Sequence, residues 1–229
     1  MGVNTDSMEL LELDDHQFHR DAARRARATL VRLCGAAGSV AALIVVLVGL
    51  PKLGIGYPHS RAIVPGLTAP SETLLRLFGI TPVLVAVAAL TIVSVVRKLP
   101  YGIGAVIGLT VGASLTTAAV RAWAYGLVPA SALPNGSVTA CAALICGAAL
   151  VAAPRFVPAV TGLGAVVALT VAGAAVVGGS ATVVGIVTTF LIVALWWALA
   201  STVMVFSPVA AEREAANPLD TAAMALRRR

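Results

Sequence analysis

Long stretches without a charged side chain alternate with short clusters of arginine along this chain. The first two apolar runs cover residues 33–51 and 77–96. Two longer runs follow: residues 99–154, in which Arg121 is the only charge, and residues 156–211, which have none. About 20 apolar helical residues cross a bilayer, so each longer run is sufficient for two crossings and a turn. The pattern predicts six membrane helices.

The breaks between these helices follow from turn-forming residues. Residues 123–136 supply one turn, and the Gly178-Gly179-Ser180 triplet supplies another. We therefore expect an all-α, polytopic membrane protein, a six-helix bundle, with a tail at 1–29, a membrane domain at 30–207 and a tail at 208–229. The predicted helices are about 30–51, 74–96, 101–122, 136–153, 156–178 and 181–206.

Arginine and lysine positions also predict the orientation of the bundle. Short cytoplasmic segments retain Lys and Arg, and an even number of spans places both termini on one side. With both termini inside, twelve of the sixteen cations are cytoplasmic. Lys52, Arg61, Arg76 and Arg121 are then the four on the outer side. The arginine-rich, alanine- and valine-rich composition indicates a bacterial protein, and we expect it to be multi-pass in the inner membrane.

Composition excludes several classes of protein. The chain is 59% hydrophobic and 11% charged, too apolar for a water-exposed domain. A soluble enzyme is excluded, and so is a nucleic-acid-binding protein, because the net charge of +6 comes from clusters between apolar runs. Cys34, Cys141 and Cys146 lie in apolar segments without metal-ligand spacing, so we interpret all three as small core residues and expect no metal or cofactor.

Glycines at four-residue spacing mark the third predicted helix. Gly104, Gly108 and Gly112 place bare backbone on one stripe, where a neighbouring helix can approach closely. The sequence does not decide whether this seam closes the bundle or binds another membrane protein or a second copy of the chain.

The predicted helices contain few groups for transport chemistry. The last three have no ionisable side chain apart from cysteine, which argues against an ion-coupled transporter. His59, in the loop after the first helix, is most simply a solvated residue. A channel or exporter component is an alternative hypothesis, because the third helix is rich in hydroxyl groups. The same hydroxyls can equally form hydrogen bonds between helices. These hydroxyls are Thr110, Ser114, Thr116 and Thr117.

The segment between the third and fourth helices resembles the type 2 phosphatidic acid phosphatase superfamily. Six-helix members of that family have Lys-x6-Arg-Pro and Pro-Ser-Gly-His motifs on the outer side. Here Arg121 stands at the Lys position, Val128 replaces the phosphate-binding Arg, and Pro129 is kept. The second motif reads Pro134-Asn-Gly-Ser137, with serine at the position of the histidine that protonates the leaving group.

The family's third motif, Arg-x5-His-x3-Asp, is also replaced. Its positions best match Val171, Val177 and Ala181, so the resemblance implies a bundle that has lost its nucleophile. Phosphoryl transfer needs a nucleophile, a proton donor and cations that hold the phosphate oxygens. Residues 123–211 have no His, Asp, Glu, Lys or Arg except Arg155, which the topology places on the other side.

These observations predict a protein that binds a lipid phosphate, or one that serves as an accessory subunit of an envelope or membrane complex, without catalysis. The alternative is an active phosphatase acting on a polyprenyl or glycerolipid phosphate. The candidate ligand contacts are Arg121, Asn135, Ser137 and Thr139. Arg121 can bind a phosphate bidentately. In a purely structural reading, Asn135-Gly136 forms a tight turn and Ser137 caps the helix that follows.

Overall fold

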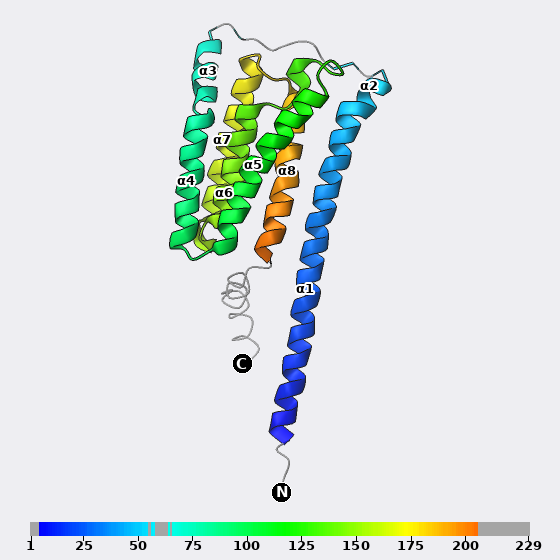
Figure 1. Ribbon diagram of the computed structural model, residues 1–229, viewed down its shortest axis with the longest axis vertical. Coiled ribbons are helices and arrows are strands. Elements are labelled where there is room, and N and C mark those ends of the chain that lie inside the picture. The colour runs from blue at the N-terminus through cyan, green and yellow to red at the C-terminus, as the bar shows by residue number, and fades with distance from the viewer. Residues whose placement is uncertain (1–4, 55, 58–63, 65, 206–229) are drawn as a thin grey trace.

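The computed structural model describes the backbone of residues 5–54, 56–57, 64 and 66–205, and this part of the chain is almost entirely helical (Figure 1). His59 and the tail 206–229 lie outside the described residues. The longer helices are α1 (Thr5–Ile44), α3 (Thr68–Arg76), α4 (Ile80–Val96), α5 (Pro100–Trp123), α6 (Gly136–Val151), α7 (Val157–Val177) and α8 (Val183–Val205). The short ones are η1 (Val45–Gly49), α2 (Leu50–Lys52), η2 (Ala130–Ala132) and η3 (Pro154–Phe156).

The helices confirm the all-α, polytopic membrane class. Within the described residues, five helical stretches are long and apolar enough to cross a membrane, and α3 with α4 makes a sixth if the pair counts as one span. Each of these stretches overlaps a charge-free run of the sequence.

The second predicted helix is not continuous, because α3 and α4 meet at an angle of 43°. Backbone N–H groups of Leu77, Phe78 and Gly79 bond three residues back, which tightens the end of α3, and Gly79 is then extended with φ −71° and ψ 175°. The break also places Pro82 in the first turn of α4, where its missing N–H costs no helical hydrogen bond. Glycine and proline together account for the break.

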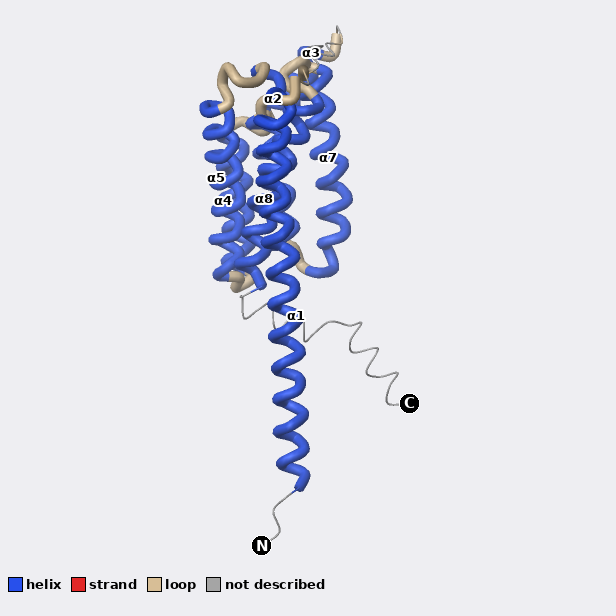
Figure 2. Tube along the Cα trace, turned by 90° about the vertical axis from the view of Figure 1, so that its right-hand side faces the viewer, coloured by secondary structure: helices blue, strands red, loops and turns tan. Residues whose placement is uncertain are grey.

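Helix α1 is longer than the predicted first span. Its 40 residues make a rod of about 60 Å that extends well beyond the rest of the bundle (Figures 1 and 2). Inside the bundle α1 packs chiefly against α8, and Arg32 Nη1 donates to the Ser201 carbonyl at 2.9 Å. At its other end α1 continues into η1, where the buried Tyr57 hydroxyl donates to the Val46 carbonyl. Burial raises the pKa of the Tyr57 phenol.

Helices α5, α6 and α8 form the centre, since each of them packs against the other two. Of the three glycines of the α5 seam, Gly112 alone contacts a neighbour: a Cβ there would lie 2.5 Å from the Trp196 ring of α8. A Cβ at Gly104 or Gly108 would meet nothing within 4 Å. The close approach of α7 to α6 instead depends on Gly164, which faces Ile145.

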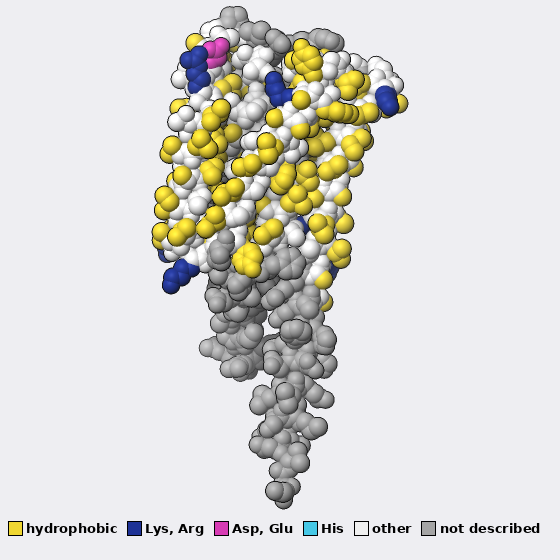
Figure 3. Space-filling model, in the orientation of Figure 1, with side chains coloured by type: hydrophobic (Ala, Val, Ile, Leu, Met, Phe, Trp, Pro, Cys, Tyr) yellow, Lys and Arg dark blue, Asp and Glu magenta, His cyan; other side chains and the backbone are white. Residues whose placement is uncertain are grey.

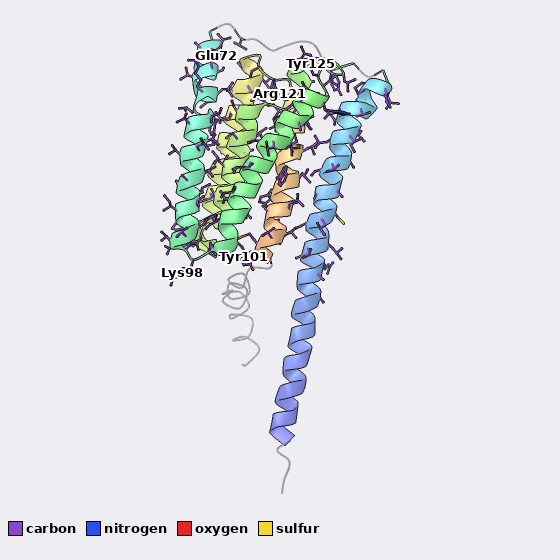
Figure 4. All side chains as sticks on the ribbon, viewed as in Figure 1. Glu72, Lys98, Tyr101, Arg121 and Tyr125 are labelled. Carbon is purple, nitrogen blue, oxygen red and sulfur yellow. The ribbon has the colours of Figure 1, made fainter. Side chains whose placement is uncertain are left out.

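The surface has an apolar band between two charged ends, as a membrane environment requires (Figure 3). Arg121 and Tyr125 lie at one end, which we call the Arg121 end, and Lys98 and Tyr101 lie at the other, the Lys98 end (Figure 4). The interpretation of the cysteines as core residues holds for Cys141, which is buried. It is wrong for Cys34, which is exposed on the outward face of α1.

Candidate functional site

The connection from α5 to α6 is folded into the Arg121 end of the bundle. Ala124, Ala132 and Leu133 are at most 3% exposed, although all three belong to a connecting segment. The segment is fixed to the start of α8 because the Ser131 carbonyl accepts both the backbone N–H and the hydroxyl of Thr182, the residue before α8. Residues that follow this segment are therefore held in defined positions.

Asn135 joins three parts of the chain at the start of α6. Its Oδ1 accepts from the backbone N–H groups of Ser137 and Val138, at 3.1 and 3.2 Å, so Asn135 rather than Ser137 is the N-cap of α6. Its own backbone N–H donates to Thr189 Oγ1 of α8 at 2.9 Å, and Nδ2 lies 3.4 Å from Ser180 Oγ. The side chain is occupied by structural hydrogen bonds.

Thr139 is also engaged within the bundle. It is 1% exposed, its hydroxyl donates to the Asn135 carbonyl, and its Oγ1 lies 3.1 Å from Thr117 Oγ1 of α5. This pair fixes α5 against α6, and Thr139 is not among the residues that line the groove described below.

Arg121 stands in the last turn of α5 with an exposed side chain. One guanidinium nitrogen, Nη1, donates to the Pro134 carbonyl at 2.9 Å, immediately before the N-cap of α6. The guanidinium group is therefore held beside the first turn of α6, and its other N–H groups are available for an anion.

A lateral groove opens beneath this position, between α4 and α5 with α6 as its floor. Its cavity volume is about 540 Å³, within the range typical of small-molecule sites. Ile80, Leu84 and Leu115 are more than 60% exposed and form the apolar rim, so the groove faces the surrounding hydrocarbon. The lining residues are Phe78, Gly79, Ile80, Val83, Leu84, Val87, Thr110, Val111, Ser114, Leu115, Gly136, Ser137 and Ala140.

Arg121 lies on the same face of α5 as the residues that line the groove. Ser114 lies seven residues before Arg121, and seven residues make nearly two helical turns, so the two share a stripe about 10 Å apart along the axis. Ser137 lines the groove from the first turn of α6, three residues after Pro134, whose carbonyl binds Arg121. The apolar groove and the cation therefore lie along one face of α5, with the cation nearer the charged end of the bundle.

Two of the residues matched to the phosphatase motifs line the groove, and other matched residues lie elsewhere. Ser137 and Gly136 line it. Val128, matched to the phosphate-binding Arg, packs in a cluster with Leu43 and Tyr57, whereas Val171, from the third motif, packs in a different apolar cluster. The positions matched to the three motifs are not gathered around one cavity, and the family relationship stays a prediction.

The groove residues are suited to binding hydrocarbon. Their side chains are hydrocarbon apart from three hydroxyls, and no acid, base or thiol is among the lining residues. No cluster of His, Cys, Asp and Glu suited to a metal occurs in the described part of the chain. The arrangement can hold a hydrocarbon chain and an anion.

Sequence reasoning identified the cation and Ser137 but missed the α4 wall of the groove. Gly79 and Pro82, which break the second span, are visible in the sequence and indicate a helix break. They do not show which faces of the helices line a groove. No known protein family, curated protein or solved structure matches this chain.

Proposed function

We propose that this protein binds an anionic membrane lipid, with one hydrocarbon chain in the lateral groove and the phosphate at Arg121, and that it does so without chemical turnover. The groove is the observation that carries the proposal. It is apolar, lies between two membrane helices and shares one face of α5 with the exposed Arg121.

The hydrocarbon part follows from the position of the groove. Its rim residues are exposed at the level of the membrane spans, so the solvent that reaches them is the acyl region of the bilayer. A lipid chain can enter from the side without crossing a polar surface. This makes a membrane lipid a better occupant than a water-soluble molecule of the same size.

The anionic part follows from Arg121. A guanidinium group presents several N–H donors in a plane that matches phosphate oxygens, and one donor is already fixed to the Pro134 carbonyl. Asn135 satisfies the N–H groups of Ser137 and Val138, so the α6 terminus contributes little to anion binding. We therefore assign the affinity for phosphate mainly to Arg121.

The membrane that we propose is the bacterial inner membrane, with both termini on the cytoplasmic side and Arg121 in the outer leaflet. This proposal depends on the distribution of Lys and Arg along the sequence.

Native mass spectrometry of the full chain in mild detergent, with added dioleoyl phosphatidic acid, tests the proposal. We expect a retained lipid whose occupancy falls about tenfold in Arg121→Gln, because a charged hydrogen bond is lost. Arg76→Gln is the matched control at the same end, since the salt bridge of Arg76 within the described residues is to the exposed Glu72. Equal occupancy in the two variants would overturn the role of Arg121.

A second pair of variants tests the groove itself. Ala140→Leu fills the floor of the groove and should reduce lipid occupancy, whereas Ala165→Leu adds the same volume on the exposed face of α7. An assay for released inorganic phosphate completes the experiment, with no release above background expected. Release that depends on Ser137 would instead establish an active phosphatase.

A role as an accessory subunit is the second candidate, and one observation favours it. Gly104 and Gly108 leave the backbone of α5 open, with nothing within 4 Å of an added Cβ. If another membrane helix packs there, Gly108→Leu will release a co-purifying chain and leave lipid occupancy unchanged. If no co-purifying chain is released from the Gly108→Leu variant, this candidate function is contradicted.

A further inference from the structure

Two serine hydroxyls in the groove lack a partner among the described residues. Serine and threonine in membrane helices usually donate to the carbonyl four residues back. Thr91, Ser94 and Thr110 all do so here. No such bond joins the Ser114 hydroxyl to Thr110, and the Ser137 hydroxyl likewise has no hydrogen bond within the described chain, although its backbone N–H is bound by Asn135.

Both hydroxyls line an apolar groove, where an unsatisfied donor is costly. They reach the groove from different helices, Ser114 from α5 and Ser137 from α6. Hydroxyls from two walls therefore converge on one cavity. Thr110 has the one other hydroxyl among the lining residues, and the remaining side chains offer no acceptor, so a bound molecule can supply acceptors to both serines.

The depth of these hydroxyls indicates which acceptor it is. Ser137 lies three residues after Pro134, whose carbonyl binds Arg121, and Ser114 lies about 10 Å from Arg121 along α5. In an ester-linked glycerolipid, carbonyl oxygens lie just below the phosphate, between the head group and the hydrocarbon. A prenyl phosphate has only hydrocarbon at that depth.

We infer that the groove selects an acyl-ester lipid, with ester carbonyl oxygens accepting hydrogen bonds from Ser114 and Ser137. This inference rests on the proposed function, because it requires that an anionic lipid occupies the groove. It assigns the choice between ester-linked and prenyl lipids to two side chains other than Arg121.

Lipid competition followed by native mass spectrometry tests the inference on the full chain in mild detergent. The probes are dioleoyl phosphatidic acid, its dialkyl ether analogue, which has the same phosphate but no carbonyl groups, and farnesyl phosphate. We expect the ester lipid to bind more tightly than the ether lipid by about fivefold for each of the two neutral hydrogen bonds, and also more tightly than farnesyl phosphate. In the combined Ser114→Ala and Ser137→Ala variant, the ester and ether lipids should bind equally.

Thr170→Ala is the control, because Thr170 is an exposed hydroxyl on α7 that already donates to the Val166 carbonyl. Its preference for the ester lipid should match that of the unchanged chain. Equal binding of ester and ether lipids by the unchanged chain would overturn the inference, and so would a preference that persists in the serine double variant. Arg121-dependent binding of all three probes would still support the proposed function, whereas no binding of any probe would contradict both.

Discussion

The indole ring of Trp196 lies directly against the backbone of Gly112. A Cβ at Gly112 would be 2.5 Å from three atoms of the ring, and Trp196 Nε1 donates to Thr116 Oγ1, one turn further along α5, at 2.9 Å. The missing side chain and the hydrogen bond together set the distance between α5 and α8. The central pair of helices therefore depends on a glycine that no larger residue can replace without movement of the ring.

Gly112→Ala should destabilise the bundle by about 1–3 kcal/mol, because the added methyl group overpacks this contact. Gly108→Ala is the matched control in the same helix, since its Cβ would meet nothing within 4 Å. Alanine is the better helix former, so the control should be neutral or stabilising by up to about 1 kcal/mol. Unfolding in mixed micelles with increasing SDS measures both, and equal midpoints would contradict the packing described.

Asn135→Ala should cost about 0.5–2 kcal/mol, as loss of an N-cap does. Asn135→Asp keeps an oxygen that accepts from Ser137 and Val138 and removes only the weaker donation to Ser180. The aspartate variant should therefore retain most of the stability. The same unfolding titration distinguishes them, and an aspartate variant as unstable as the alanine variant would show that the cap is not the main contribution.

Thr117 and Thr139 form a polar contact between α5 and α6 that a double-mutant cycle can isolate. Replacing each with Val, singly and together, should give a coupling energy of about 0.6 kcal/mol, typical of hydrogen bonds between membrane helices. The hydrogen bond from Thr139 to the Asn135 carbonyl does not contribute to the coupling energy. It is lost when Thr139 is replaced, whether Thr117 is present or already replaced. Additive effects would mean that the two hydroxyls do not interact.

The distribution of cations predicts that Tyr125 faces the outside of the cell and Lys98 the cytoplasm. Both side chains are exposed, so each can be replaced with Cys in a chain whose exposed Cys34 is changed to Ser. A membrane-impermeant maleimide should label Tyr125→Cys in intact cells and Lys98→Cys only after lysis. The reverse pattern would invert the orientation and place Arg121 in the inner leaflet.

The all-α membrane class and the approximate place of the apolar helices could be predicted from the sequence because charge sets them directly. Charged residues are excluded from the hydrocarbon, so the uncharged runs correspond to the membrane helices, and Gly178 and Gly179 lie at the turn between α7 and α8 as expected. The rotation of each helix could not be predicted in the same way. Helices such as α4 and α7 are apolar on every side, and no stripe shows which face packs.

This difference explains what sequence reasoning missed at the candidate site. Arg121 was identified because charge near a membrane is conspicuous. The α4 wall was not, because Val83 and Leu84 look like any other lipid-facing residues until the helix break is known. The cap was assigned to Ser137 instead of Asn135, since both residues suit that position and only the backbone conformation decides between them.

The most direct test of the central claim is to locate a bound lipid by photocrosslinking. A phosphatidic acid analogue with a diazirine in one acyl chain would be bound to the full chain in nanodiscs, irradiated and mapped by peptide mass spectrometry. We expect adducts concentrated on residues 80–87 of α4 and 110–115 of α5, reduced in Arg121→Gln and unchanged in Arg76→Gln. Adducts spread evenly over the exposed faces of α1, α4 and α7, with no dependence on Arg121, would contradict a lipid site in this groove.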